Sequence, residues 1–338
     1  MFETVNDFQA SLIDLTTKNE ACFKAAFEHQ KQLTKPPGSL GKLEEYACFM
    51  AAWQGNERPE IKLAQALVFA GNHGVCNQGV NPFPQEVTMA MVENFRNGGA
   101  AINQLATHSN ADLNIVLLSD GLATSDITVG PAMTEQECLE AINSGAAAVN
   151  LKTDILLLGE MGIGNSTISS ALCLGTFGGV GADWVGAGTG SDSEGIIKKA
   201  KVIERARAVN REGLNTPFQI LMSLGGREQA AICGALIAAR LNSIPVIIDG
   251  FIASSAIAPL ISVPEIYDHV IFAHQSAEAG HGRLLNKLGK VPMFDLGMRL
   301  GEGSGAALAL NIIRASLACH NGMATFAEAG IGTELFSR

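Results

Sequence analysis

The most constraining feature of the sequence is residues 154–167, which read DILLLGEMGIGNST. Residues 155–158 are all apolar, without the alternation of a half-exposed strand, and this predicts a strand that is buried on both faces. Asn165 and Ser166, which are good N-cap residues, then precede the apolar residues of a predicted helix. Between strand and helix the chain is broken by three glycines, Gly159, Gly162 and Gly164. A strand, a glycine-rich turn and a helix start point backbone N–H groups and the positive end of a helix at an anion.

Similar apolar runs recur along the chain, each followed by polar or glycine-rich residues and separated from the next by a helical pattern. They are residues 64–70, 114–121, 244–250, 269–276 and 292–297. Together with the central run they predict about six strands that alternate with helices. This is the pattern of a three-layer α/β/α fold, in which helices cover both faces of a mainly parallel, Rossmann-like sheet.

The N-terminal part of the chain predicts helices outside this alternation. Residues 2–33 carry apolar side chains at helical spacing and are expected to form one or two helices, with Phe8, Leu12 and Leu15 on one face.

The segment of residues 33–44 contains two prolines and two glycines, which exclude regular structure. It either connects two helices or reaches a site, where Lys35 or Ser39 would contact a substrate or a partner subunit. A helix is then expected at residues 43–53.

The C-terminal part predicts one helix over residues 306–319 and a short segment, residues 323–338, that we expect to pack back on the N-terminal helices.

Composition excludes several classes of protein. The 338 residues include 23 basic and 33 acidic side chains, a net charge of −10, which argues against a nucleic-acid partner. No apolar run has the length of a membrane span or of a signal-peptide core. The cysteines are odd in number and form no C-x-x-C pair, so we expect reduced thiols in a cytoplasmic protein. They are Cys22, Cys48, Cys76, Cys138, Cys173, Cys233 and Cys319.

Chemically active groups are expected at the carboxyl edge of the sheet, because ligands of open α/β sheets bind there. The candidates that follow predicted strands or precede the last helix are His73, Asp120, Glu160, Asp249, His274, Ser276 and Glu302. A phosphate would repel Glu160 at the mouth of its turn, so this carboxylate fits a site for a phosphosugar, facing hydroxyls or a cation. His73 is open to two interpretations, a structural histidine or a catalyst. The scattered Cys and His residues do not have zinc-site spacing.

Two of the expected site positions have open alternatives. Glu302 lies between glycines near apolar residues, where burial would raise its pKa toward that of a general base, or it is simply an acidic residue favoured at a helix N-terminus. Phe83, near Met89 and Met91, could line a slot for a flat ring or belong to the core.

Residues 181–195 are expected to form a mobile loop, and the following helix carries Lys198, Lys199 and Lys201. These lysines form a solvated face, or one of them reaches a phosphate.

Five motifs carry a resemblance to a known family. In chain order they are KPPGSLG (35–41), HGV (73–75), GEMGIGNST (159–167), GGRE (225–228) and LGEGSG (300–305). Together they closely resemble the nicotinate-nucleotide–dimethylbenzimidazole phosphoribosyltransferases, enzymes of cobalamin nucleotide-loop assembly. The similarity runs from about residue 30 to the C-terminus, and the GEMGIGN and GEGSG motifs are long and specific.

The resemblance implies transfer of phosphoribose from nicotinate mononucleotide to 5,6-dimethylbenzimidazole, giving α-ribazole 5′-phosphate and nicotinate. It implies a homodimer that needs no metal or cofactor. It also implies a large domain of residues 56–305 and a small helical domain built from residues 1–55 and 306–338.

The resemblance further implies roles for individual residues. Glu302 matches the general base that takes the benzimidazole proton, Glu160 matches an acidic residue near the ribose, and Lys199 matches a basic residue of the next helix, with Lys198 one position away. The expected substrate-binding residues are Gly162, Gly164, Asn165, Ser166, Asp249, Gly250, Ser276, His73, Phe83 and Gln85.

Two departures from the family pattern affect this interpretation. Asn72 stands where an acidic residue is common, and the elbow of residues 81–84 is unusual where the base slot begins. Two other functions therefore stay open: a phosphoribosyltransferase for another acceptor such as adenine or a phenol, and a nucleotide-binding protein without catalysis. The intact Glu160 and Glu302 argue against the second.

Overall fold

The centre of the computed structural model, which describes residues 2–188, 190 and 192–331, is a sheet in which all neighbouring strands run parallel. The strand order is β2-β1-β3-β4-β5. The strands are β1 (Ala64–Ala70), β2 (Asp112–Leu117), β3 (Ile155–Met161), β4 (Val246–Ile248) and β5 (Val270–Phe272). The predicted α/β class with a parallel sheet is confirmed.

The described residues form five strands, where the sequence predicted about six. The last predicted strand, residues 292–297, forms one parallel bridge, between His274 and Phe294. It begins with Pro292, which has no N–H to donate to a ladder, and ends at Gly297, whose φ of +67° is not that of a strand.

Both faces of the sheet are buried, and alternate side chains of each strand enter different cores. In β1, Leu67 and Phe69 belong to one core, whereas Ala66 and Val68 belong to the other. This explains why the strands read as continuous apolar runs.

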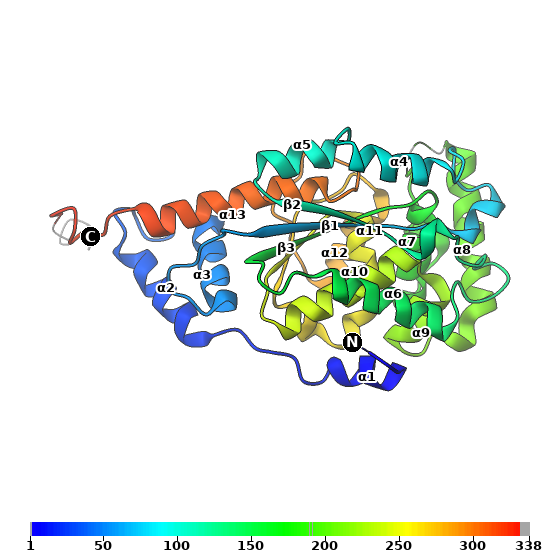
Figure 1. Ribbon diagram of the computed structural model, residues 1–338, viewed down its shortest axis with the longest axis horizontal. Coiled ribbons are helices and arrows are strands. Elements are labelled where there is room, and N and C mark those ends of the chain that lie inside the picture. The colour runs from blue at the N-terminus through cyan, green and yellow to red at the C-terminus, as the bar shows by residue number, and fades with distance from the viewer. Residues whose placement is uncertain (1, 189, 191, 332–338) are drawn as a thin grey trace.

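Helices cover the two faces (Figure 1). The core on the face of Leu67 and Phe69 includes residues of seven helices that follow β2 in the chain. Four of them are α6 (Glu135–Ala148), α7 (Asn165–Phe177), α10 (Arg227–Leu241) and α11 (Phe251–Ile257). The other three are α8 (Ser193–Asn210), α9 (Pro217–Leu224) and α12 (Ala279–Leu288). The opposite face packs against α4 (Val87–Arg96), α5 (Ala101–His108) and α13 (Ser304–Gly322). Short 3₁₀ helices occur at η1 (Gly74–Gln78), η2 (Ser119–Gly121), η3 (Gly181–Asp183), η4 (Arg211–Gly213), η5 (Ala258–Ser262) and η6 (Pro264–Tyr267).

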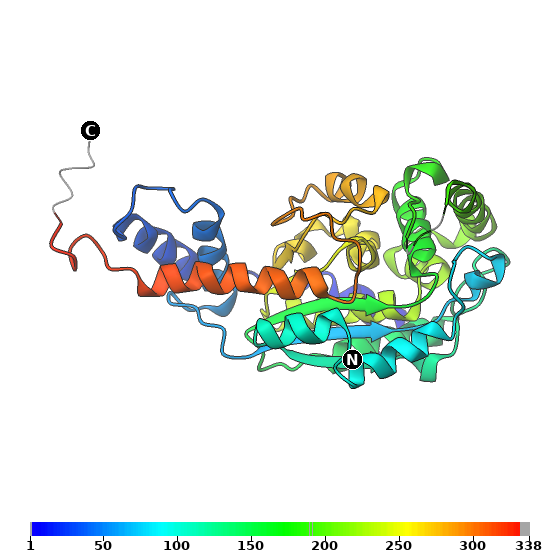
Figure 2. The ribbon, with the colours of Figure 1, turned by 90° about the horizontal axis from the view of Figure 1, so that it is seen from above.

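Residues 2–33 form two helices, which lie in different places. Helix α1 (Val5–Ser11) packs on the large α/β part, where the ring of Phe8 lies 5.6 Å from that of Phe218. Helices α2 (Glu20–Gln32) and α3 (Lys42–Gln54) lie instead beside the C-terminal half of α13 (Figures 1 and 2). Helix α3 also packs against the sheet, through Ala47 and Met50.

The C-terminal segment packs on the N-terminal helices, as predicted, over the residues that the structure describes. The N–H of Phe326 donates to the carbonyl of Gln32 at 2.8 Å, and that of Thr34 donates to Ala324 at 3.0 Å. Residues 332–338 of the predicted segment lie outside the described residues. None of the described helices combines the length and apolar character that crossing a membrane requires.

Candidate functional site

A cleft lies at the carboxyl edge of the sheet, as the strand pattern predicted. Its lining includes Glu160 and the turn after β3, the residues after β4 and β5, and the segment before α13. Of the residues predicted from sequence, Glu160, Gly162, Asn165, Ser166, Gly250, His274 and Ser276 line it.

The turn after β3 leads directly into α7, and its geometry differs from the predicted capping. The N-cap of α7 is Gly164, with a φ of +91°, and Asn165 is the first helical residue. Gly164 is required here because a Cβ would also lie 2.8 Å from the sulfur of Cys76. The side chain of Asn165 does not cap the helix but donates to Glu160 Oε2. The N–H groups of Asn165 and Thr167 donate to the carbonyls of Gly162 and Gly164 at 3.1 and 3.0 Å. The turn thus takes up part of the first N–H groups of α7, and the positive end of the helix dipole is what attracts an anion here.

Glu160 is a buried carboxyl at the end of β3, with 3% of its surface exposed. Burial, followed by the negative charges of Glu228, Asp249 and Glu302, raises the pKa of Glu160 well above its usual value. A cationic ligand in the cleft would favour the ionised form of this group.

Glu302 lies beside Glu160, in a backbone conformation that is unusual for a residue other than glycine. Its φ is +64°, between two glycines that also have positive φ, and 6% of its surface is exposed. Its Oε2 is buried without a hydrogen-bond partner among the described residues. Burial, followed by the charge of Asp249, raises the pKa of Glu302 to about 7. A carboxylate with this pKa suits proton abstraction near neutral pH.

Asp249, which follows β4, holds the segment that carries Glu302. Its Oδ2 accepts from the N–H of Gly303 at 3.0 Å and its Oδ1 from the N–H of Ala306 at 3.0 Å. His274 Nε2 lies 3.5 Å from Oδ1; although burial opposes the imidazolium, the hydrogen bond and charge of Asp249 raise the pKa of His274. Both carboxylate oxygens of Asp249 thus accept hydrogen bonds from the start of α13. The spacing of residues in the sequence could not reveal these bonds.

A cationic side chain lies near the N-terminus of α7. Lys199, which is 3% exposed, places Nζ 3.4 Å from Ser166 Oγ and 3.5 Å from the carbonyl oxygen of Ala187. Burial lowers the pKa of Lys199, and the charge of Glu278 acts in the opposite direction. Lys198 is exposed, so the helix register places Lys199, and not Lys198, beside Ser166, which lines the cleft.

Sequence reasoning missed three groups near Lys199. Arg299 donates from Nη1 to the carbonyl of Gly188 at 2.8 Å, and the N–H of Gly188 donates to Glu278 at 3.3 Å. The position of Arg299 three residues before Glu302 was the one available signal. Of the predicted loop at residues 181–195, residues 181–183 form η3 and α8 begins at Ser193, while residues 189 and 191 lie outside the described residues.

Three other predicted residues, His73, Gln85 and Phe83, are not among the residues that line the cleft. His73 has no exposed surface and its Nε2 lies 2.9 Å from Glu228 Oε1. The Gln85 side-chain amide donates to the carbonyl oxygen of His73 at 2.5 Å. Phe83 is 47% exposed in the segment before α4.

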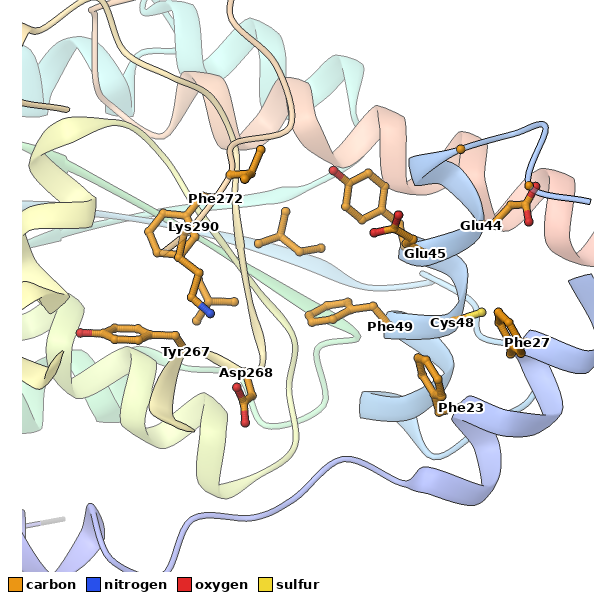
Figure 3. Close-up of a pocket in the computed structure, with 16 residues that line it drawn as sticks. Phe23, Phe27, Glu44, Glu45, Cys48, Phe49, Tyr267, Asp268, Phe272 and Lys290 are labelled. Carbon is orange, nitrogen blue, oxygen red and sulfur yellow. The ribbon is translucent and has the colours of Figure 1, made fainter. Parts of the chain in front are cut away.

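A second cavity, of about 610 Å³, lies at the opposite edge of the sheet, between α3 and the segment that leads into β5 (Figure 3). Phe23, Phe27 and Phe49 face it from α2 and α3, and Tyr267 and Lys290 face it from the other side. The sequence signal for this cavity was the i, i+4 spacing of Phe23 and Phe27, which places both rings on one face of a helix. Among the described residues, no group of three or more His, Cys, Asp or Glu side chains is arranged to hold a metal ion.

Comparison with known proteins agrees with this geometry. A family model described as Phosphoribosyltransferase matches residues 15–331. The nicotinate-nucleotide–dimethylbenzimidazole phosphoribosyltransferase of Rhodobacter capsulatus is 54% identical over 94% of this chain and 95% of its own length, and that of Novosphingobium aromaticivorans is 52% identical over 99% of both. The crystal structure of CobT from Thermus thermophilus superposes with a TM-score of 0.86 at 36% identity, covering 93% of this chain and 99% of that one. The chain therefore belongs to the nicotinate-nucleotide–dimethylbenzimidazole phosphoribosyltransferase family.

Proposed function

We propose that this protein transfers phosphoribose from nicotinate mononucleotide to 5,6-dimethylbenzimidazole, giving α-ribazole 5′-phosphate and nicotinate for cobalamin biosynthesis. The observation that carries the proposal is the buried, unpartnered Oε2 of Glu302, which lies beside Glu160 at the cleft and has a pKa of about 7.

In the proposed reaction Glu302 is the general base. One ring nitrogen of the benzimidazole attacks the anomeric carbon of the ribose, while the bond from that carbon to the nicotinate nitrogen breaks. The electron pair of that bond leaves with nicotinate, whose ring nitrogen is cationic in the nucleotide and neutral afterwards. The proton on the other benzimidazole nitrogen passes to the Glu302 carboxylate. Attack opposite the leaving group inverts the anomeric carbon, which gives the α product.

The other residues of the cleft bind and stabilise the sugar phosphate in this proposal. The N-terminus of α7, Ser166 and Lys199 lie together and would hold the phosphate. The ionised form of Glu160 would stabilise the positive charge that develops on the ribose, since bound cationic nucleotide lowers the pKa of a neighbouring carboxyl. Holding the two rings on opposite faces of the ribose supplies much of the remaining rate enhancement.

We propose that the protein acts as a homodimer in the cytoplasm. The second cavity supports a partner subunit, because two apolar side chains that line it, Phe27 and Val291, are 49% and 81% exposed. All seven cysteines are free thiols, which fits a reducing compartment. Sedimentation should show one dimeric species, and Phe27→Glu should shift it toward monomer, whereas a monomeric wild type would contradict the proposal.

The domain division stays a proposal as well: a large part of residues 56–305 and a small helical part from residues 1–55 and 306–338. The positions of α2, α3 and the end of α13 support it, while α1 packs against the large part.

Product analysis tests the function. Purified protein receives nicotinate mononucleotide with dimethylbenzimidazole, and separately with adenine, and the products are separated by liquid chromatography and identified by mass spectrometry. We expect α-ribazole 5′-phosphate and one equivalent of nicotinate. Product with adenine alone would show that the acceptor is another base. Absence of product with either acceptor would favour the other alternative, a protein that binds the nucleotide without catalysis.

A further inference from the structure

A buried acid–base pair lies directly beneath the turn that follows Glu160. His73 follows β1, Glu228 lies in the first turn of α10, and both side chains have no exposed surface. His73 Nε2 is 2.9 Å from Glu228 Oε1, and in the part of the chain that the structure describes no other basic side chain pairs with this carboxylate. A buried carboxylate is costly unless it is paired, so Glu228 depends on His73 at this depth.

Three glycines surround the pair so closely that none could carry a side chain without a shift of its neighbours. A Cβ on Gly71 would lie 2.8 Å from Glu228 Oε2, and one on Gly162 would lie 2.9 Å from His73 Nε2. A Cβ on Gly226 would lie 2.4 Å from His73 Cε1. The pair therefore packs against the underside of Gly162, whose other side lines the cleft.

The charge of the pair also reaches the carboxyl at the end of β3. The negative charge of Glu228 is one of the causes that raise the pKa of Glu160, after burial. Both the shape of the turn and the charge around Glu160 thus depend on groups that do not reach the cleft themselves.

We propose that His73 and Glu228 are positioning residues, which hold the Gly162 turn in place and set the charge that Glu160 experiences. This inference rests on the proposed function, because it assigns the pair a role in that reaction. The charged and polar groups that act on Glu160 come from four segments. They are Glu228 of α10, Asp249 at the end of β4, Glu302 before α13 and Asn165 of α7. Glu228 in turn faces His73, and Asp249 faces His274.

Kinetics of the full-length protein test the positioning role. Glu228→Ala and His73→Ala should each lower kcat about 10- to 100-fold, with the KM for nucleotide changed less than about threefold, because substrate is bound but misaligned. Glu228→Gln keeps the shape of the side chain beside His73 and should restore most of kcat. The matched control is Glu137→Gln, since Glu137 pairs with Arg227, the neighbour of Glu228, at 2.5 Å. The inference is overturned if Glu228→Ala keeps the kcat of the wild type, or if kcat falls as much in Glu137→Gln as in Glu228→Ala.

A titration without substrate tests the charge. Carbon NMR of protein labelled at the glutamate carboxyls, with Glu160 assigned through Glu160→Gln, should show Glu160 titrating at lower pH in Glu228→Gln than in wild type, because a negative charge is gone. An unchanged titration would contradict the inference. This readout needs neither the alanine variants nor turnover, so failure of the wild type to make product would count against the proposed function alone.

Discussion

The main-chain N–H of Glu302 donates to the main-chain carbonyl of Glu160, with 3.2 Å between nitrogen and oxygen. The two carboxyl groups are thus held together through backbone and not through flexible side chains. A Cβ on Gly159 would lie 2.3 Å from the nitrogen of Gly303, which shows how closely the two segments pack. Because a backbone contact sets their spacing, each carboxyl can be altered by substitution without moving the other.

Glu302→Gln should abolish most turnover while nucleotide binding is retained. The amide cannot accept the benzimidazole proton, so kcat should fall about 10²- to 10⁴-fold. Single-turnover rates and calorimetric binding of nicotinate mononucleotide would measure the two effects. Asp295→Asn, which removes an exposed carboxylate from the same segment, should leave both unchanged. A near-normal kcat in Glu302→Gln would show that another group is the base.

The pH dependence of kcat/KM should reflect Glu302 in the free enzyme. The base must be ionised, and burial raises its pKa to about 7, so activity should fall as pH decreases below that value. This acidic limb should be absent from the residual activity of Glu302→Gln. A profile that stays flat from pH 8 down to the ordinary range of a carboxylic acid would contradict the assignment.

Glu302→Gln should also stabilise the folded protein above neutral pH. The pKa of Glu302 rises from 4.5 to about 7 on folding, so its favourable contribution is complete below pH 4.5 and is lost as pH rises toward 7. Glutamine does not ionise, and its variant should gain roughly 1–3 kcal/mol relative to wild type at pH 8 and little at pH 4.5. Urea unfolding at both pH values measures the difference. A gain that is equal at both would reflect packing and not charge.

Lys199→Met should weaken binding of the nucleotide through its phosphate. Loss of a charge-assisted hydrogen bond should raise the KM about 10- to 100-fold, with a smaller effect on kcat. Lys198→Met is the matched control, because this neighbouring lysine is exposed. Equal effects of the two substitutions would mean that general charge, and not the position of Lys199, attracts the substrate.

Gly159→Ala should damage both stability and turnover. The added Cβ would lie 2.3 Å from the nitrogen of Gly303, so the two carboxyl segments must separate, at a cost of about 1–3 kcal/mol or more. Gly130→Ala, at a position where a Cβ would meet nothing within 4 Å, should be close to neutral. Thermal unfolding and kcat of both variants would measure this. Full activity in Gly159→Ala would show that the spacing of the two segments is not critical.

The features of the site that the sequence predicted are those that depend on residues close together in the chain. The strand that ends at Glu160 and the glycine-flanked Glu302 were recognisable because apolar runs and glycine turns are local signals. The parallel sheet then placed both groups at one edge, since the carboxyl ends of parallel strands meet there.

What the sequence could not reveal depends on contacts between distant segments. Asp249 resembles a free carboxylate at a strand end, but it accepts hydrogen bonds from Gly303 and Ala306 at the start of α13. Asn165 resembles an N-cap, but its side chain is drawn to Glu160, and Gly164 takes the cap position. Local propensity cannot include such partners, because they are set only when the chain is folded.

Helix α13 begins two residues after Glu302 and ends among the helices at the far end of the molecule, where Gln30 contacts the side chain of His320 at 2.7 Å (Figure 2). Its 19 residues make a rod about 28 Å long. If α13 moves as a rigid body, a tilt of α2 and α3 at one end would displace, at the other end, the segment that carries Glu302, the proposed general base. Binding at the helices of the far end would then have a mechanical route to the proposed reacting centre.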